Sequence, residues 1–138
     1  MRPIYETDYD RQRESSVSAY VSEKYRCTFK KSEDLTSFDG IFVDRNGQDF
    51  AVVEIKVRNN RSDKYPTYMI SAAKVDAILS YADNMGLFPM LLVKFTDGVF
   101  ITKLSDRYLK SLGGRQDRND PSDMEICVYI PMEKFKAL

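Results

Sequence analysis

The sequence predicts a mixed α/β (α+β) fold in which helices flank a central sheet. Two segments have apolar side chains at helical spacing, and two pairs of apolar, β-rich segments are joined by short Asn-Gly and Asp-Gly turns. The chain has 138 residues, of which 43% are hydrophobic and 30% are charged, and this suits one globular domain over residues 1–138. The expected order of elements is αβββαββαβ.

The first half of the chain is expected to form one helix and three strands. Glu14, Val17 and Val21 recur at helical spacing and predict the inner stripe of the helix. An Asn-Gly pair between two apolar segments is the strongest short signal for an antiparallel hairpin. The expected segments are residues 8–25 for the helix and residues 27–30, 38–44 and 49–57 for the strands.

The second half is expected to add a helix, a second hairpin and a final strand. Ser71 can cap the helix at its start, and Gly86 can end it. Asp97-Gly98 predicts a tight turn, and a polar, glycine-led stretch predicts a long loop. The expected segments are a helix at 71–84, strands at 90–95 and 99–104, a short helix near 105–112, a loop at 113–123 and a strand at 125–130.

The residue types exclude several kinds of chemistry. Because the chain has no histidine, catalysis by imidazole and imidazole-ligated zinc are removed. Cys27 and Cys127 suggest neither a disulfide framework nor a thiolate metal site. The formal charge is zero, so a nucleic-acid partner would have to meet a local basic patch. The apolar runs are too short for a membrane span, and the first residues lack a signal peptide's apolar region, so a cytoplasmic protein is expected.

The first hairpin predicts a pair of carboxylates. If Asn46 and Gly47 are the two loop residues, Asp39 lies directly opposite Glu54, and Lys56 lies two residues further on the same face. Side chains that are directly opposite have Cβ atoms roughly 4.5 to 5.5 Å apart. Asp39 and Glu54 can therefore hold one cation between them.

Glu54 and Lys56 interrupt an apolar strand, where unpaired charge is costly. A divalent cation would compensate the two carboxylates, and ligation by oxygen alone suits Mg²⁺, for which Mn²⁺ can substitute. We expect Asp39, Glu54 and the Ile55 carbonyl to bind the metal. Lys56 would then orient the attacking water beside a phosphate, so the expected reaction is phosphodiester hydrolysis.

This arrangement resembles the signature of PD-(D/E)xK nucleases, because Asp39 is followed by Glu54-Ile55-Lys56 on the next strand. Phe38 stands where the signature often has proline. The resemblance implies a restriction endonuclease-like core with the order αβββαββ, here with an added C-terminal strand, and a Mg²⁺-dependent deoxyribonuclease. By the same resemblance, Glu14 and Lys74 are expected to join the active site. Within this superfamily, the sequence resembles small phage-borne members or Holliday junction resolvase-like members.

Several basic residues are expected to contact the nucleic-acid backbone, since phosphate neutralisation supplies most nonspecific affinity. A domain this small favours recognition of DNA structure, such as junctions, flaps or ends, and a homodimer would present two sites to such a substrate. RNA stays open as a substrate. The residues expected at the backbone are Arg58, Arg61, Lys64, Lys74, Arg115 and Arg118.

Other interpretations of the same residues remain open at this point. Glu54 and Lys56 could form a solvated salt bridge on an edge strand. Glu14 could be an exposed glutamate that only interacts favourably with the helix dipole near the start of its helix. The protein could keep the nuclease fold as a nucleic-acid-binding or assembly protein without cleavage. It could also be a sugar- or nucleotide-handling enzyme that uses the carboxylate pair without metal.

Overall fold

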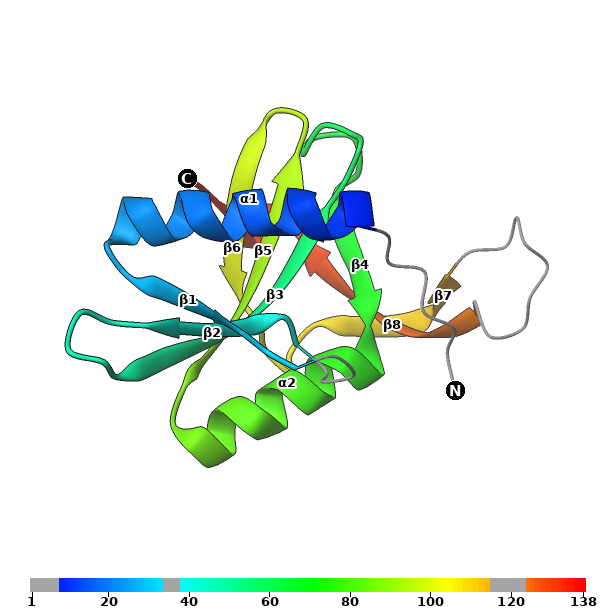
Figure 1. Ribbon diagram of the computed structural model, residues 1–138. Helices are drawn as coiled ribbons and strands as arrows, with labels where there is room; N and C mark the ends of the chain where they lie inside the picture. The colour runs from blue at the N-terminus through cyan, green and yellow to red at the C-terminus, as the bar shows by residue number, and fades with distance from the viewer. Residues whose placement is uncertain (1–7, 34–37, 115–123) are drawn as a thin grey trace.

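The computed structural model describes residues 8–33, 38–114 and 124–138, and its centre is a mixed six-stranded sheet (Figure 1). The order of strands in this sheet is β1-β2-β3-β5-β6-β9, and a second sheet has the order β4-β8-β7. The helices are α1 (Asp8–Tyr25) and α2 (Ala72–Met85), with a short 3-10 helix, η2 (Met132–Lys134). The strands are β1 (Thr28–Lys31), β2 (Gly40–Val43), β3 (Asp49–Val57), β4 (Thr67–Ser71), β5 (Phe88–Phe95), β6 (Gly98–Lys103), β7 (Leu109–Gly114), β8 (Met124–Pro131) and β9 (Lys136–Ala137).

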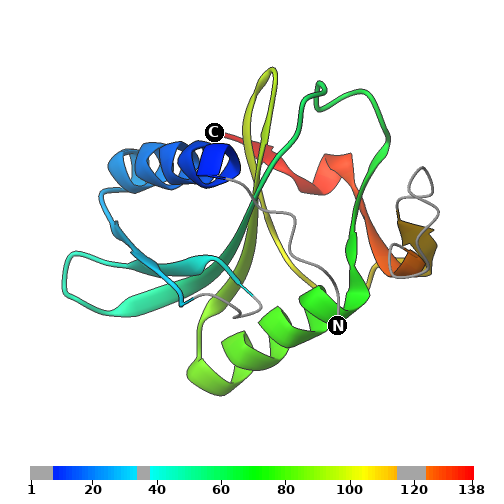
Figure 2. The same cartoon turned by 45° about the vertical axis from the view of Figure 1, so that its right-hand side comes forward.

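The two faces of the central sheet are covered by different elements. Val17 and Val21 of α1 pack with Val53 and Ile55 of β3 on one face. On the other face, the core contains residues of α2, β4 and β8 together with Val52 of β3. Figure 2 shows α1 and the second sheet on opposite sides of the central strands. Within the described ranges, no helix combines the length and apolar character that crossing a membrane requires.

Strand β3 lies at the centre of the fold and carries the charged residues of the predicted signature. It pairs with β2 in antiparallel fashion and with β5 in parallel. Because side chains alternate along a strand, Glu54 and Lys56 share the face of Val52, which is the face covered by α2. Both charges therefore project from a buried central strand, and not from an edge.

The predicted register of the first hairpin is confirmed, although its turn differs from the prediction. Gly40 pairs with Val53, as a two-residue Asn-Gly turn would require, and Asp39 immediately precedes Gly40 at the start of β2. The turn itself is longer, because the Asp44 N–H donates to the Gln48 carbonyl and Val43 pairs with Asp49. A bulge between Phe42 and Val43 then restores the predicted pairing.

Helix α2 begins and ends at the predicted residues. The Ser71 hydroxyl accepts a hydrogen bond from the Lys74 N–H at 3.3 Å and donates one to Glu125 at 2.9 Å. Gly86 adopts a left-handed conformation with φ of 69° and ends the helix. This cap fixes the first turn of α2, and with it Lys74, against the second sheet.

Two predictions for the second half are corrected. The helix expected near residues 105–112 does not form, because Leu109 to Gly114 pair with β8 as β7, and pairing with a distant strand overrides local preference. Strand β4 was not predicted at all. Gly113 and Gly114, expected to open a loop, belong to β7, and residues 115–123 lie outside the described residues.

A glycine is required where β2 passes β1. A Cβ atom added at Gly40 would collide with the Phe29 ring and lie 2.6 Å from the Lys30 carbonyl oxygen, which is backbone and cannot move freely. Gly40→Ala is therefore expected to lower the free energy of unfolding by about 1–3 kcal/mol, measured by urea denaturation. Lys31→Ala, at an exposed site opposite Gly40, should change it by less than about 0.5 kcal/mol. Equal urea midpoints for the two variants would contradict this prediction.

Candidate active site

The site is centred on two carboxyl groups at the point where β2 begins beside β3. Glu54 is only 2% exposed, and its carboxyl group lies beside that of Asp39, which raises the Glu54 pKa. Asp39 Oδ2 also accepts a hydrogen bond from the Ile55 N–H at 2.6 Å. The Asp39 carboxylate thus accepts a hydrogen bond from the β3 backbone in place of a carbonyl of a neighbouring strand. This bond holds the carboxylate against β3.

The electrostatics of Glu54 are dominated by its burial. The pKa of Glu54 is raised to about 8, first by burial and then by the hydrogen bonding and negative charge of Asp39, while the charges of Lys56 and Lys74 oppose this rise. At neutral pH and without a bound cation, the Glu54 carboxyl group therefore holds a proton. A divalent cation that binds these carboxyl groups would displace this proton.

Two lysines approach Glu54 from different elements. Lys74 Nζ of α2 lies 3.0 Å from Oε2, and Lys56 Nζ lies 4.0 Å from Oε1. The short distance to Lys74 is an ion pair without hydrogen-bond alignment, because Oε2 is buried and has no hydrogen-bond partner among the described residues. The lysine side chains are 31% and 33% exposed, so solvent reaches the site from the ammonium side.

These residues fit a Mg²⁺ ion with few protein ligands. The described residues contain no cluster of three or more acidic or cysteine side chains, so a site ligated wholly by side chains is not formed there. Mg²⁺ usually takes one or two carboxylates and keeps several waters. Asp39 and Glu54 provide two carboxylates, and Glu54 Oε2 is an acceptor without a hydrogen bond. The N–H and C=O groups of one residue in a strand point to the same side, and the Ile55 N–H points to Asp39. The Ile55 carbonyl therefore also lies on the side of Asp39.

Glu14, the other acidic residue predicted for the site, lies half-buried on α1, which covers the opposite face of the sheet. Its neighbour Arg13 donates to the Asn59 side chain at 3.0 Å, so this turn of α1 lies beside the segment that follows β3. That segment begins just beyond Lys56. A role for Glu14 in the site stays a prediction.

Apart from Lys74, which pairs with Glu54, the predicted phosphate contacts divide into three groups. Arg58 and Lys64 lie over the rings of Tyr68 and Tyr65, with the cation 5.2 and 5.3 Å from the ring centroid. Arg61 forms ion pairs with Asp63 and Asp97 at 3.2 and 3.8 Å, so two carboxylates already compensate its charge. The remaining two, Arg115 and Arg118, lie outside the described residues.

One residue beside the site was missed by the sequence interpretation. Tyr68 of β4 is 6% exposed, and burial raises the pKa of its phenol to about 12, with the Arg58 guanidinium opposing this and the Glu54 charge adding to it. The phenol oxygen is buried without an aligned hydrogen bond in the described part of the chain. No motif marks Tyr68. The alternation of Tyr68 and Ile70 with the exposed Met69 could have indicated β4 itself.

The fold is similar to a solved structure of Archaeoglobus fulgidus Hjc, a Holliday junction resolvase from an archaeal hyperthermophile. The TM-score is 0.59 with 11% sequence identity, over 91% of this chain and 92% of that one. A likeness at this identity shows the fold alone, and it confirms the predicted restriction endonuclease-like architecture. No curated protein gives a significant match.

Fold and signature together define a nuclease of the PD-(D/E)xK class. The model of a family described as "Phage putative PDDEXK endonuclease" matches residues 1–138, the whole chain. The chain belongs to this family, as the resemblance of its carboxylates and lysine predicted.

Proposed function

We propose that the protein is a metal-dependent deoxyribonuclease that hydrolyses phosphodiester bonds at Asp39, Glu54 and Lys56, with Mg²⁺ as its metal and Mn²⁺ as a substitute. The observation that carries this proposal is the buried Asp39–Glu54 pair, in which an acceptor oxygen lacks a hydrogen bond while two lysines flank it. Such a pair is unfavourable in a core unless it binds a cation. Membership of a PD-(D/E)xK family supports the same chemistry.

Each residue has a distinct role in the proposed reaction. Asp39, Glu54 and the Ile55 carbonyl would hold the cation at the start of β2. When bound, Mg²⁺ supplies Lewis-acid activation of water and positive charge beside the phosphate. Lys56, which is nearer to solvent than Glu54, would orient the attacking water and offset charge that develops on the phosphate oxygens. Lys74 would balance Glu54 and contact the phosphate.

We further propose that the substrate is DNA with a structural feature such as a junction, flap or end. A chain of 138 residues has little room for a separate sequence-reading module, and a homodimer would present two sites to a branch point. Cys27 and Cys127 form no disulfide, which fits an intracellular setting, where thiols stay reduced.

Labelled four-way, flap, single-stranded and linear duplex DNA should be cut with Mg²⁺ or Mn²⁺ and left intact with EDTA. We expect branched substrates to be cut severalfold faster than linear duplex of the same sequence, as measured by initial rates on denaturing gels. Binding without cleavage of any substrate in Mg²⁺ would instead favour an assembly or binding protein. Cleavage of linear duplex at an equal rate would remove the proposed structure selectivity alone.

A further inference from the structure

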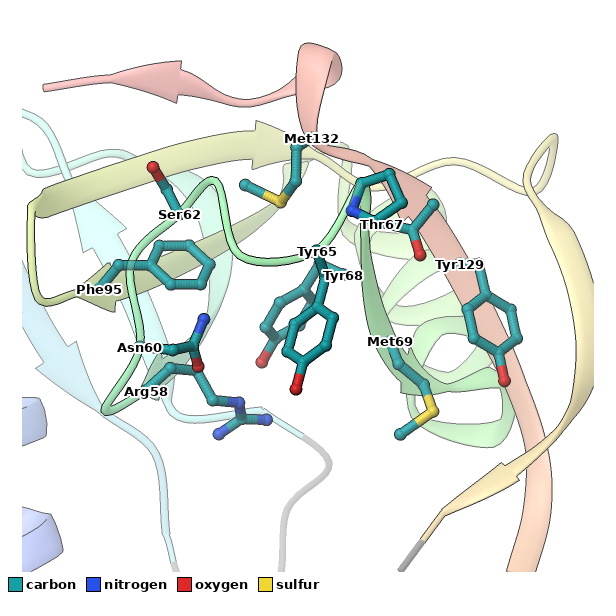
Figure 3. A pocket seen from close by; sticks show the side chains of 11 residues that line it. Arg58, Asn60, Ser62, Tyr65, Thr67, Tyr68, Met69, Phe95, Tyr129 and Met132 are labelled. Carbon is teal, nitrogen blue, oxygen red and sulfur yellow. The ribbon is translucent and has the colours of Figure 1, made fainter.

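A cleft of about 440 Å³ opens beside the candidate active site, where β4 faces the segment of residues 58–66 (Figure 3). Aromatic and thioether side chains form much of its lining, among them Tyr65, Tyr68, Tyr129 and Met69. A few polar groups join them, including Arg58 and Asn60. A largely apolar pocket with a few convergent polar groups is the usual form of a ligand site.

The cleft and the candidate active site are continuous. Arg58 follows Lys56 by two residues at the end of β3, which spans about 7 Å of extended chain. Tyr68 lines the cleft, and the negative charge of Glu54 contributes to the raised pKa of its buried phenol. Figure 3 shows the Tyr65 and Tyr68 rings between Arg58 and Asn60 on one side and Met69 on the other. A strand whose phosphate lay at Lys56 would therefore place an adjacent nucleotide at this cleft.

The wall opposite β4 is held in place by its own contacts. The Thr96 N–H donates to the Asn60 carbonyl at 3.0 Å, and the Ser62 hydroxyl donates to Asp97 at 2.6 Å. The backbone N–H of Ser62 donates to the same carboxylate at 2.8 Å. The 58–66 segment is thus tied to the β5–β6 turn. A cleft that is formed before binding does not have to be ordered by its ligand.

We propose that this cleft binds an unpaired nucleobase of the DNA strand that enters the active site, with the base against the exposed Tyr65 ring and near the Tyr68 hydroxyl, and with its phosphate beside Arg58. The inference rests on the proposed nuclease function and narrows its substrates to DNA with an unpaired nucleotide near the cut. Three observations support a base. Aromatic rings stack on any base, the buried Tyr68 hydroxyl lacks an aligned partner in the described residues, and Arg58 supplies a cation for the phosphate. A paired base cannot enter a cleft without leaving its helix.

The test places 2-aminopurine at successive positions of a single-stranded arm and measures its fluorescence on binding. The Lys56→Ala background in Mg²⁺ is expected to slow cleavage enough for the DNA to stay uncut during the measurement, and Lys56 does not line the cleft. We expect strong quenching at one position, because stacking on a ring quenches this base. Tyr65, which is 57% exposed, can be replaced without disturbing the core. In the Tyr65→Ala variant the quenching should be lost, and affinity for the single-stranded arm should fall about 5- to 150-fold.

Tyr20→Ala is the matched control, because Tyr20 is an exposed tyrosine on α1 and does not line the cleft. It should leave both signals unchanged, and Tyr65→Phe should retain them because the ring remains. Quenching that is absent, equal at all positions, or insensitive to Tyr65→Ala would overturn the inference while DNA binding itself persists. If fluorescence anisotropy detects no binding of any DNA, the proposed function fails as well.

Discussion

Lys56→Ala is expected to reduce the rate of Mg²⁺-dependent DNA cleavage by about 10²- to 10³-fold. Lys56 Nζ lies 4.0 Å from Glu54 Oε1 and is partly exposed, so it can reach a phosphate held beside that carboxylate. Removing the ammonium group removes charge that the reaction needs most in its transition state. The loss should therefore appear in single-turnover rates at saturating protein, while affinity for uncut DNA changes little.

The control for this prediction is Lys94→Ala. Lys94 lies on β5, next to β3, but its side chain is exposed on the opposite face of the sheet from Lys56. Both variants lose one positive charge and should unfold at nearly the same urea concentration as the parent. Equal cleavage by Lys56→Ala and the parent would show that the signature lysine does not act in the reaction. Equal losses in both variants would point to a general effect of charge on DNA binding.

The hairpin was the most informative part of the sequence, because a turn and an alternating strand fix which side chains share a face. The prediction that Asp39 and Glu54 meet required only the correct register. The register was correct although the turn was not, since the bulge after Phe42 compensates the longer turn. Neither the bulge nor the hydrogen bond from the Ile55 N–H to Asp39 could be predicted, because they depend on where β2 begins and ends.

Features that depend on contacts between distant segments were harder to predict from the sequence. The pairing of Leu109 to Gly114 with β8 is decided by residues ten or more positions away, so the local pattern wrongly predicted a helix. Strand β4 was missed for a similar reason, although it carries Tyr68. Lys74 was expected near the site from the family pattern, and the structure places it 3.0 Å from Glu54. The sequence alone could not determine which way the first turn of α2 faces.

Without divalent cations, the protein is expected to lose stability as the pH rises from about 4.5 to about 8. The pKa of Glu54 is about 8 in the folded protein, against 4.5 for the unperturbed group, so between these values the folded state holds a proton that the unfolded state has released. The stabilisation is complete below pH 4.5 and is lost as the pH passes through 8. The slope approaches about 1.4 kcal/mol per pH unit, measured by urea unfolding in EDTA.

Glu54→Gln should remove this slope, because an amide does not titrate, and the variant should be more stable than the parent at pH 8 in EDTA. Adding Mg²⁺ at pH 8 should stabilise the parent and leave Glu54→Gln nearly unchanged, since the ion replaces the proton only on a carboxylate. Asp49→Asn is the control, because it neutralises a carboxylate on the same strand that is 34% exposed, against 2% for Glu54. If the parent and Glu54→Gln keep the same pH slope in EDTA, then Glu54 does not hold a proton in the folded state. An ion that stabilises both equally would have to bind away from the buried pair.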